Sequence, residues 1–330
     1  VMKILLAPME GLTDVYMRDI LTTIAGRQGY DWCVTEFIRV TQQLLPAKIF
    51  YQYCPELLQD SKTNAGTLVH IQLLGSDPQL LAENAHLATE LGAPAIDLNF
   101  GCPAKSVNSH RGGAVLLDEP ETIYQIVSAV RRAVPTHIPV SAKMRLGFND
   151  RLPMLDNALA IQSAGASWLT VHARTKADAY KPPAHWHELA KIRQHVTLPV
   201  IANGDVNSMS SLAQCLHESQ CFDVMIGRGA VIRPDLVAQI RGTQAALTWS
   251  ELVQWQLKFL DDMHQAVVQP NSIHEGYVKS TEKGAIGRYK QWLAMLSQHW
   301  PQAKLLFELV KKESLYQKIV ALVLASAAYP

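Results

Sequence analysis

The stretch AIDLNFGCP, residues 95–103, joins a buried strand to a polar end. Its first residues are mostly apolar, as in a strand that is covered on both faces of a parallel sheet. It then ends in Asn99, Gly101, Cys102 and Pro103, where glycine lets the backbone bend and proline stops the strand. An amide and a thiol therefore follow the carboxyl end of this strand. In barrels of parallel strands, catalytic groups lie at that end.

Seven further short apolar runs share this pattern, and helical patterns alternate with all eight runs. We expect the other strands at residues 3–7, 31–37, 67–74, 138–146, 167–172, 198–202 and 222–226. Regular alternation of strands and helices predicts a parallel sheet. Eight such units fit a (β/α)8 TIM barrel. An open doubly wound sheet is the weaker alternative, because no G-x-G-x-x-G follows the first strand.

The alternation stops after Gly242, and the rest of the chain has a helical pattern. We expect amphipathic helices over residues 248–268, over 282–299, and from 301 to the end. The sequence thus predicts an α/β barrel over residues 1–243 and a small all-helical domain over residues 244–330. A hydrophobic content of 48% is ample for a large core.

The overall composition narrows the setting of the protein. Its net charge is only +1, so bulk charge points to neither a nucleic-acid nor a membrane partner. The five cysteines are odd in number and contain no C-x-x-C pair, which favours a reduced, cytoplasmic setting. No apolar run approaches the length of a membrane span, and the opening VMKILLAPMEG lacks the length and cleavage pattern of a signal peptide.

Polar side chains recur at the carboxyl ends of nearly all the expected strands. The candidates are Met9 and Glu10 after the first strand, then Gln72, Asn99, Cys102, Lys143, Arg145, His172, Asn203 and Arg228, of which only Met9 is apolar. Any one of them could cap a helix or satisfy a loop, but their shared position favours a single site. A lysine in the middle of VSAKMRL is costly to bury without an anionic partner, so we interpret Lys143 as functional.

Glycines mark the ends of the seventh and eighth expected strands, at Asn203-Gly204 and at Gly227-Arg228-Gly229. In TIM barrels these two loops commonly form a phosphate site from backbone N–H groups. Glycine permits close approach of the backbone, and Arg228 adds charge-assisted hydrogen bonds. Ordinary turn glycines are the alternative. Together with Lys143 and His172, the pattern favours a phosphorylated cofactor.

Cys102 differs from the other cysteines, which we interpret as inert packing. It follows a glycine and precedes a proline at the catalytic end of its strand. Its thiol could act as a nucleophile, a metal ligand or a proton donor. No second cysteine or histidine lies at ligand spacing, so no metal site is expected. An unperturbed thiol pKa of about 8.5 leaves the group protonated and able to act as an acid.

An ordered set of motifs resembles the tRNA-dihydrouridine synthases. The motifs are APMEG at 7–11, TEF at 35–37, QLLG at 72–75, LNFGCP at 98–103, KMRLG at 143–147, VHART at 171–175, NGDV at 203–206 and MIGRG at 225–229. The segment GRYKQWL, residues 287–293, is most similar to the bacterial subfamily C of that family, which acts on the uridine at position 16 of the D-loop. The resemblance covers the whole chain.

This resemblance implies an FMN-binding barrel, a helical tRNA-recognition domain and NADPH as the electron donor. It also implies a monomer that binds the D-loop and elbow of tRNA. The residues implied at the flavin are Pro8, Met9, Glu10, Gln72, Lys143, His172, Asn203, Gly204, Asp205, Gly227 and Arg228. Cys102 is implied as the proton donor to the uracil. The residues implied at the base or elsewhere on the tRNA are Arg39, Asn99, Arg145, Tyr180, Arg288 and Lys290.

Two other functions remain open at this point. An FMN-dependent barrel oxidoreductase of a small molecule, similar to dihydroorotate dehydrogenase, would have a comparable flavin pocket. It would not need Arg288, Lys290 or a long helical tail. A barrel that binds RNA without catalysis is disfavoured by the presence of Cys102 and of the whole set of flavin residues.

Overall fold

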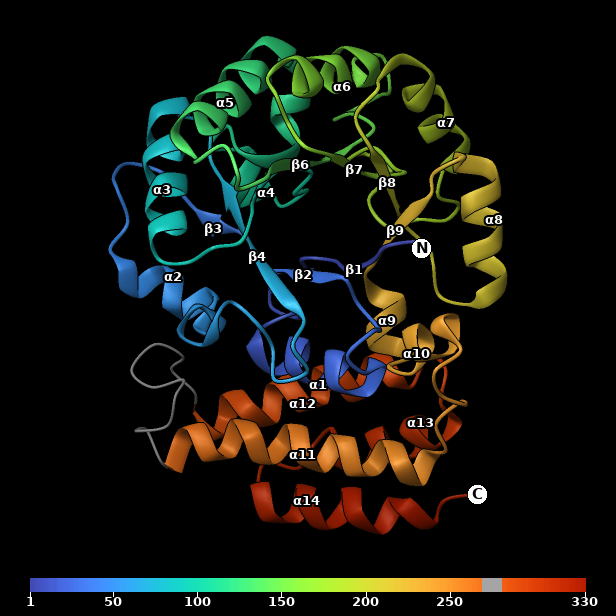
Figure 1. Ribbon diagram of the computed structural model, residues 1–330. Helices are drawn as coiled ribbons and strands as arrows, with labels where there is room; N and C mark the ends of the chain where they lie inside the picture. The colour runs from blue at the N-terminus through green and yellow to red at the C-terminus, as the bar shows by residue number, and fades with distance from the viewer. Residues whose placement is uncertain (269–280) are drawn as a thin grey trace.

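Residues 1–268 and 281–330 are described by a computed structural model of the chain. Within them, the strands form one parallel sheet in the order β2-β1-β9-β8-β7-β6-β5-β4, and pairing of β2 with β4 closes it into a barrel (Figure 1). The strands are β1 (Ile4–Leu6), β2 (Trp32–Val34), β3 (Ile38–Arg39), β4 (Leu68–Leu74), β5 (Ile96–Phe100), β6 (Val140–Arg145), β7 (Leu169–His172), β8 (Val200–Asn203) and β9 (Asp223–Ile226). The predicted TIM barrel is confirmed.

The single strand expected over residues 31–37 is wrong in detail, because β2 ends at Val34 and a second short strand, β3, begins only at Ile38. Both pieces pair with β4, through Val34 with His70 and Ile38 with Leu73. Three residues lie between Val34 and Ile38, whereas only two lie between their partners His70 and Leu73 on β4. The extra residue forces the chain to bulge out of the ladder between β2 and β3.

Helices surround the barrel, as the alternation predicts. They are α1 (Val15–Ala25), α2 (Ala47–Tyr53), α3 (Pro78–Glu90), α5 (Pro120–Ala133), α6 (Met154–Ser163), α7 (Trp186–His195) and α8 (Met209–Ser219). The short helices α4 (Lys105–Asn108), α9 (Arg228–Ile232) and α10 (Leu236–Arg241) lie in or after loops. Asp14 and Asp77 accept hydrogen bonds from backbone N–H groups of the first turns of α1 and α3, and thereby fix where these helices begin.

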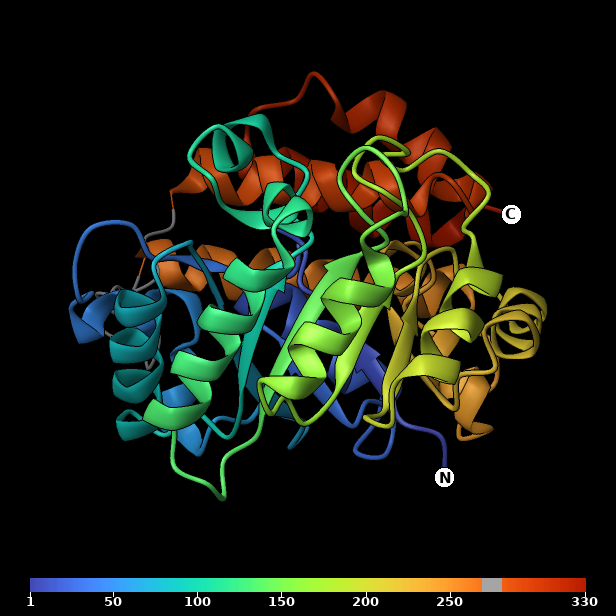
Figure 2. The same cartoon turned by 90° about the horizontal axis from the view of Figure 1, so that it is seen from above.

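The C-terminal region contains α11 (Trp249–Val268), α12 (Glu282–Leu296), α13 (Pro301–Val310) and α14 (Tyr316–Ala325). These helices pack beside α1 and α9 of the barrel, and their apolar side chains belong to the same continuous core (Figure 1). The buried Trp292 indole donates to the carbonyl of Val231 in α9 across this junction. In Figure 2, the loops after the strands and the red helices α12–α14 lie at the end of the barrel opposite the N-terminus.

The amino ends of the strands are filled by aromatic rings. Trp32 stacks on His70 with 5.0 Å between ring centroids, and Trp168 lies 5.1 Å from Trp32. We call these three residues the aromatic plug. Burial lowers the pKa of His70 to about 3, so its imidazole is neutral at physiological pH. Within residues 1–268 and 281–330, no helix has the length and apolar character that crossing a bilayer requires.

Candidate active site

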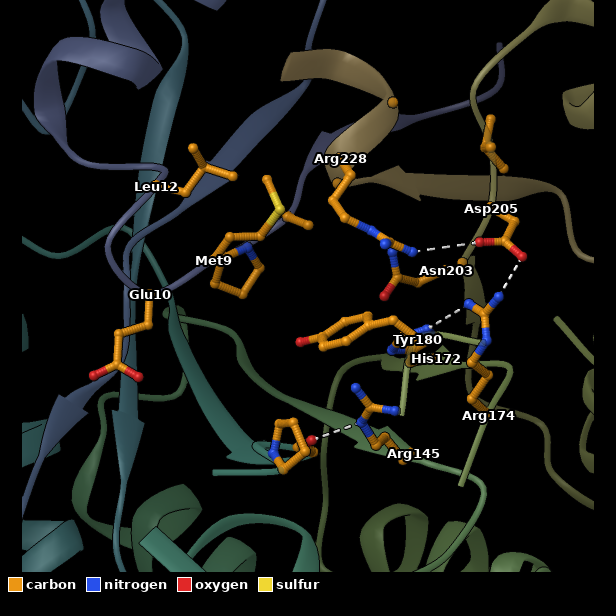
Figure 3. Close-up of a pocket in the computed structure, with 18 of the residues that line it drawn as sticks. Met9, Glu10, Leu12, Arg145, His172, Arg174, Tyr180, Asn203, Asp205 and Arg228 are labelled. Carbon is orange, nitrogen blue, oxygen red and sulfur yellow. Dashed lines mark hydrogen bonds and ion pairs between the residues drawn. The ribbon is translucent and has the colours of Figure 1, made fainter. Parts of the chain in front are cut away.

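A cavity of about 830 Å³ opens at the carboxyl ends of the strands (Figure 3). Most of the side chains that the sequence marks as functional meet in it, although they come from all parts of the barrel. Those that line it are Pro8, Met9, Glu10, Asn99, Cys102, Lys143, Arg145, His172, Tyr180, Asn203, Gly204, Asp205, Gly227 and Arg228. The cavity walls do not include Gln72, Arg39, Arg288 or Lys290.

Lys143 presents an ammonium group to this cavity from the middle of β6. Its strand pairs with β5 so that Lys143 lies beside Asn99. No hydrogen bond joins its side chain to any residue that the structure describes. Burial, with a smaller contribution from the charge of Arg145, lowers the pKa of Lys143 to about 8, although Asp97 opposes this shift. An ammonium in the cavity wall that has no hydrogen-bond acceptor among the described residues is suited to a ligand that brings one.

Cys102 lies in the cavity wall, and the backbone on both sides of its thiol is held by asparagine side chains. Its N–H donates to Oδ1 of Asn99 at 2.9 Å. Its carbonyl accepts from Nδ2 of Asn108 at 3.0 Å and from the N–H of Ala114 at 3.1 Å. Burial, helped by the charge of Glu10, raises the pKa of the Cys102 thiol. The thiol is therefore protonated at neutral pH, as a proton donor must be. Asn108 did not stand out in the sequence.

The loops after β8 and β9 touch each other, and glycine makes this contact possible. A Cβ atom on Gly229 would lie 2.1 Å from the carbonyl oxygen of Val206. This separation is too short for any side chain, so only glycine fits at this position. Gly204 has a φ of +120°, which L-residues rarely adopt, and a Cβ atom there would lie only 3.1 Å from the ring of His172. These two loops thus bring bare backbone to the cavity, as a phosphate site requires.

Asp205 lies between two arginines beside these loops (Figure 3). One of its carboxylate oxygens accepts from Arg174, and the other lies 3.7 Å from the guanidinium of Arg228. Arg174 is fully buried and also contacts His172 Nε2 at 3.3 Å. Burial and the surrounding cations lower the pKa of His172 well below its ordinary value, so the ring is neutral. Arg174 lies within the VHART motif, but its partner is 31 positions away, which hides its role in the sequence.

The charges on the cavity wall do not cancel. Four cationic side chains line it, namely Lys143, Arg145, Arg174 and Arg228, against the two carboxylates of Glu10 and Asp205. The surplus of two positive charges matches the charge of a phosphate monoester at neutral pH. Figure 3 shows that Arg174 and Arg228 converge on one side of the cavity, next to Asp205.

Arg145 braces two loops and an aromatic ring. Its Nε donates to the carbonyl of Gly101 at 2.9 Å, and its Nη1 donates to the carbonyls of Thr175 and Ala179 at 3.0 and 2.8 Å. The loops after β5 and β7 are thereby joined. The ring of Tyr180 lies between Arg145 and Arg228, with the guanidinium carbons 5.2 and 4.9 Å from its centroid (Figure 3). Tyr180 is half exposed, so its ring forms part of the cavity rim.

Four residues that the sequence predicts to be functional lie outside the cavity wall, and their side chains form hydrogen bonds with other groups of the protein. Gln72 is fully buried, and its amide bonds to Asp97 and Asn99. Arg39 donates to the carbonyl of Ser106 at 3.1 Å. Arg288 pairs with Asp14 and donates to the carbonyl of Leu12, while Lys290 donates to the carbonyls of Lys311 and Glu313. From the helical region, the cavity instead takes Gln291 and Gln298, which the sequence had not singled out.

Comparison with known proteins agrees with this geometry. The family model described as "Dihydrouridine synthase (Dus)" matches residues 5–313. A tRNA-dihydrouridine(16) synthase of Pseudomonas syringae pv. tomato is 49% identical over 326 residues, which cover 97% of this chain and 98% of that protein. A protein of the same name from Shewanella oneidensis is 43% identical over 97% of this chain and 96% of its own.

Solved structures share the fold at low identity. A 2-naphthoyl-CoA reductase superposes with a TM-score of 0.56 at 12% identity, over 78% of this chain and 53% of its own. A structure titled TcOYE with pHBA gives a TM-score of 0.52 at 13% identity, over 74% and 90%. These two likenesses establish the barrel architecture, whereas the family model and the relatives identify the group. The chain belongs to the dihydrouridine synthase family.

Proposed function

We propose that this protein reduces the uridine at position 16 of the tRNA D-loop to 5,6-dihydrouridine, with FMN as its cofactor and NADPH as the electron donor. Membership of the family makes the chain an oxidoreductase that acts on tRNA uridine. The observation that carries the proposal is one cavity that holds both the unpaired ammonium of Lys143 and the protonated thiol of Cys102. The ammonium of Lys143 can stabilise an anionic redox cofactor, and the thiol of Cys102 can protonate a reduced base.

The residues present fit FMN. A phosphate matches the surplus positive charge and the bare backbone of the two loops that meet at Gly229. The ammonium of Lys143 supplies the donor that the electron-rich polar edge of a flavin requires. Met9, whose sulfur is 3.3 Å from the position of a Cβ on Gly227, offers an apolar surface to a ring. Met9 and Gly227 thus line the cavity next to the charged groups.

We assign the flavin ring to Pro8, Met9, Glu10, Lys143 and His172, with Gln72 beneath them. The phosphate is assigned to Asn203, Gly204, Asp205, Gly227 and Arg228. We add Arg174 to this group, because it shares Asp205 with Arg228. Asp205 then acts by orienting two arginines, since a carboxylate does not itself attract phosphate. When bound, the flavin supplies a hydride to carbon 6 of the uracil ring.

Cys102 completes the reduction. Addition at carbon 6 leaves negative charge on the enolate that extends from carbon 5 to the neighbouring carbonyl. The thiol gives its proton to carbon 5, and the former C5=C6 double bond becomes a single bond. Its raised pKa keeps the thiol protonated until the base arrives. The thiolate then regains a proton from solvent before the next turnover.

A uridine inside folded tRNA cannot reach the bottom of a barrel mouth, so it must be flipped out of its stack. Tyr180 lies at the rim and is half exposed, so a base that enters the cavity passes beside it. We assign recognition of the D-loop and elbow to Arg39, Asn99, Arg145, Tyr180, Arg288 and Lys290, in a monomer that works in the cytoplasm. Arg288 and Lys290 donate hydrogen bonds to groups within the protein, so a direct contact of their side chains with tRNA stays a prediction.

The test is a reconstitution with defined RNA. Purified protein with FMN and NADPH is incubated with an unmodified tRNA transcript, and dihydrouridine is mapped by mass spectrometry of nuclease fragments. A transcript with cytidine at position 16 is the matched control. We expect one dihydrouridine, at position 16, and none in the control. Reduction at another position would contradict the assigned target, and turnover of free uracil or orotate without tRNA would favour the small-molecule alternative.

A further inference from the structure

A chain of hydrogen bonds runs through the interior of the barrel and ends at Cys102. Ser141 Oγ donates to Oδ1 of Asp97 at 2.7 Å, and Gln72 Nε2 donates to Oδ2 of Asp97 at 2.6 Å. Asn99 Nδ2 donates to Gln72 Oε1 at 2.8 Å, and Asn99 Oδ1 accepts from the N–H of Cys102 at 2.9 Å. We call this sequence of bonds the Asp97 relay.

The strand register assembles the relay. Gln72 pairs with Asp97 between β4 and β5, and Asp97 pairs with Ser141 between β5 and β6. Asp97 and Asn99 are two residues apart on β5, so both side chains point to the same side of the sheet. Asp97, Gln72 and Ser141 are all at least 97% buried, and none of the three lines the cavity. Their hydrogen bonds therefore lie below the cavity floor and need no ligand.

The carboxylate fixes the direction of every bond in the relay. A carboxylate only accepts, so Gln72 must turn its NH₂ towards Asp97 and its carbonyl oxygen towards Asn99. That oxygen accepts only from the NH₂ of Asn99, which leaves Asn99 Oδ1 for the N–H groups of Gly101 and Cys102. If the amide of Gln72 were reversed, Asn99 would have to reverse too and would present a donor to the donor N–H of Cys102.

We propose that Asp97 is a positioning residue for the reaction, because it sets the orientation of Gln72 and Asn99 and thereby the place of the Cys102 thiol. The proposal rests on the proposed function, in which Cys102 protonates the base. Asp97 does not touch the substrate. It acts two side chains away, by supplying the acceptor that anchors an ordered row of amides.

The relay also limits what Asn99 can offer to a ligand. Its Oδ1 already accepts two backbone N–H bonds, and one hydrogen of Nδ2 goes to Gln72. One N–H remains free to face the cavity. Asn99 therefore meets a flipped base as a donor only, which suits a carbonyl oxygen of uracil.

The experiment compares two substitutions of Asp97 in the full-length holoenzyme. Asp97→Leu is similar in size but removes the acceptor. Asp97→Asn is the matched control, because its Oδ1 can accept from Gln72 while its NH₂ donates to the hydroxyl of Ser141. If Asp97→Leu does not fold, as judged by its melting curve, Gln72→Met cuts the relay one residue later and leaves the bond between Asp97 and Ser141; this variant is judged by its alkylation profile alone, because Gln72 is assigned to the flavin site.

Two readouts are used. The first is the rate at which iodoacetamide alkylates Cys102, followed across pH by peptide mass spectrometry without tRNA. Residue Cys102 is 8% exposed, while the other four cysteines are at most 5% exposed and serve as internal references. The second is a stopped-flow comparison of flavin reduction by NADPH with flavin reoxidation by tRNA.

We expect Asp97→Leu to change the alkylation rate of Cys102 at least tenfold and to slow reoxidation by tRNA about 10²-fold, with flavin reduction unchanged. We expect Asp97→Asn to restore both. A wild-type alkylation profile in Asp97→Leu would overturn the proposal, as would an Asp97→Asn protein as defective as Asp97→Leu. The alkylation arm involves no RNA, so it gives its answer even if the wild-type protein fails to reduce uridine.

Discussion

The guanidinium of Arg288 lies 2.8 Å from the carboxylate of Asp14, although 274 positions separate these residues in the chain. The same guanidinium donates to the carbonyl of Leu12 at 2.8 Å. Helix α12 of the C-terminal region is therefore tied to the loop between β1 and α1, which carries Met9 and Glu10 into the cavity. The helical region thus supports the active site from the side as well as extending its wall through Gln291 and Gln298.

This ion pair predicts a measurable coupling. Asp14→Asn keeps the N-cap acceptor of α1 but removes the charge, and Arg288→Met keeps the length of the side chain. Both side chains are mostly but not fully buried, so we expect a coupling free energy of about 1 kcal/mol. The measurement is urea unfolding of the two single variants and the double variant. Additive losses would show that the contact does not stabilise the fold.

Cys102→Ala separates the two halves of the reaction. Because the thiol acts only on the base, we expect NADPH to reduce the flavin at the wild-type rate. Uridine reduction should fall by roughly 10²–10⁴, the usual contribution of a positioned acid. Stopped-flow absorbance of the flavin follows the first step, and mass spectrometry of the tRNA follows the second. Slow flavin reduction in this variant would contradict the division of roles.

Lys143 predicts a pH-dependent affinity for FMN. Its pKa of about 8 leaves the ammonium charged below pH 8 and neutral above it. A ligand that binds the charged form should keep its affinity below pH 8 and lose up to about tenfold per pH unit above it. Lys143→Met should bind FMN more weakly at pH 7 and lack this dependence. Fluorescence titration with FMN measures both, with the surface variant Lys312→Met as the control.

His70 in the aromatic plug predicts loss of stability in acid. Its pKa is about 3 in the folded protein and about 6.5 in the unfolded chain, so the unfolded chain binds more protons between these values. The free energy of unfolding therefore falls as pH drops from about 6.5 towards 3. His70→Phe removes this contribution, which amounts to about 2 kcal/mol at pH 5. Urea unfolding at pH 8 and pH 5 should show the gain of the variant over wild type only at pH 5.

Much of the site followed from local patterns. Cys102 and Lys143 each sit near the end of an apolar strand, and in a closed parallel barrel the ends of all strands meet at one mouth. The alternation of strands and helices was visible without any tertiary information. The loops at Gly204 and Gly229 were likewise expected, because glycine there has a steric cause.

Other features depend on contacts between distant segments, and the sequence alone does not contain them. The bulge between β2 and β3 arises from register against β4. The role of Arg174 comes from Asp205, which lies on the next strand's loop. Gln72 was expected at the flavin, but its depth within β4 places its amide against Asp97, below the cavity wall.

The aromatic plug has a kinetic consequence. Trp32, His70 and Trp168 fill the far end of the barrel, whereas the cavity opens at the carboxyl ends of the strands, so both substrates reach the flavin from that mouth. Under the proposed function, a nicotinamide donor and a folded RNA then compete for the same opening of the cavity. Each must dissociate before the other can bind, and the enzyme stays reduced between the two binding steps. Initial-rate plots against one substrate at several fixed levels of the other should therefore be parallel lines, with excess tRNA inhibiting by blocking the donor.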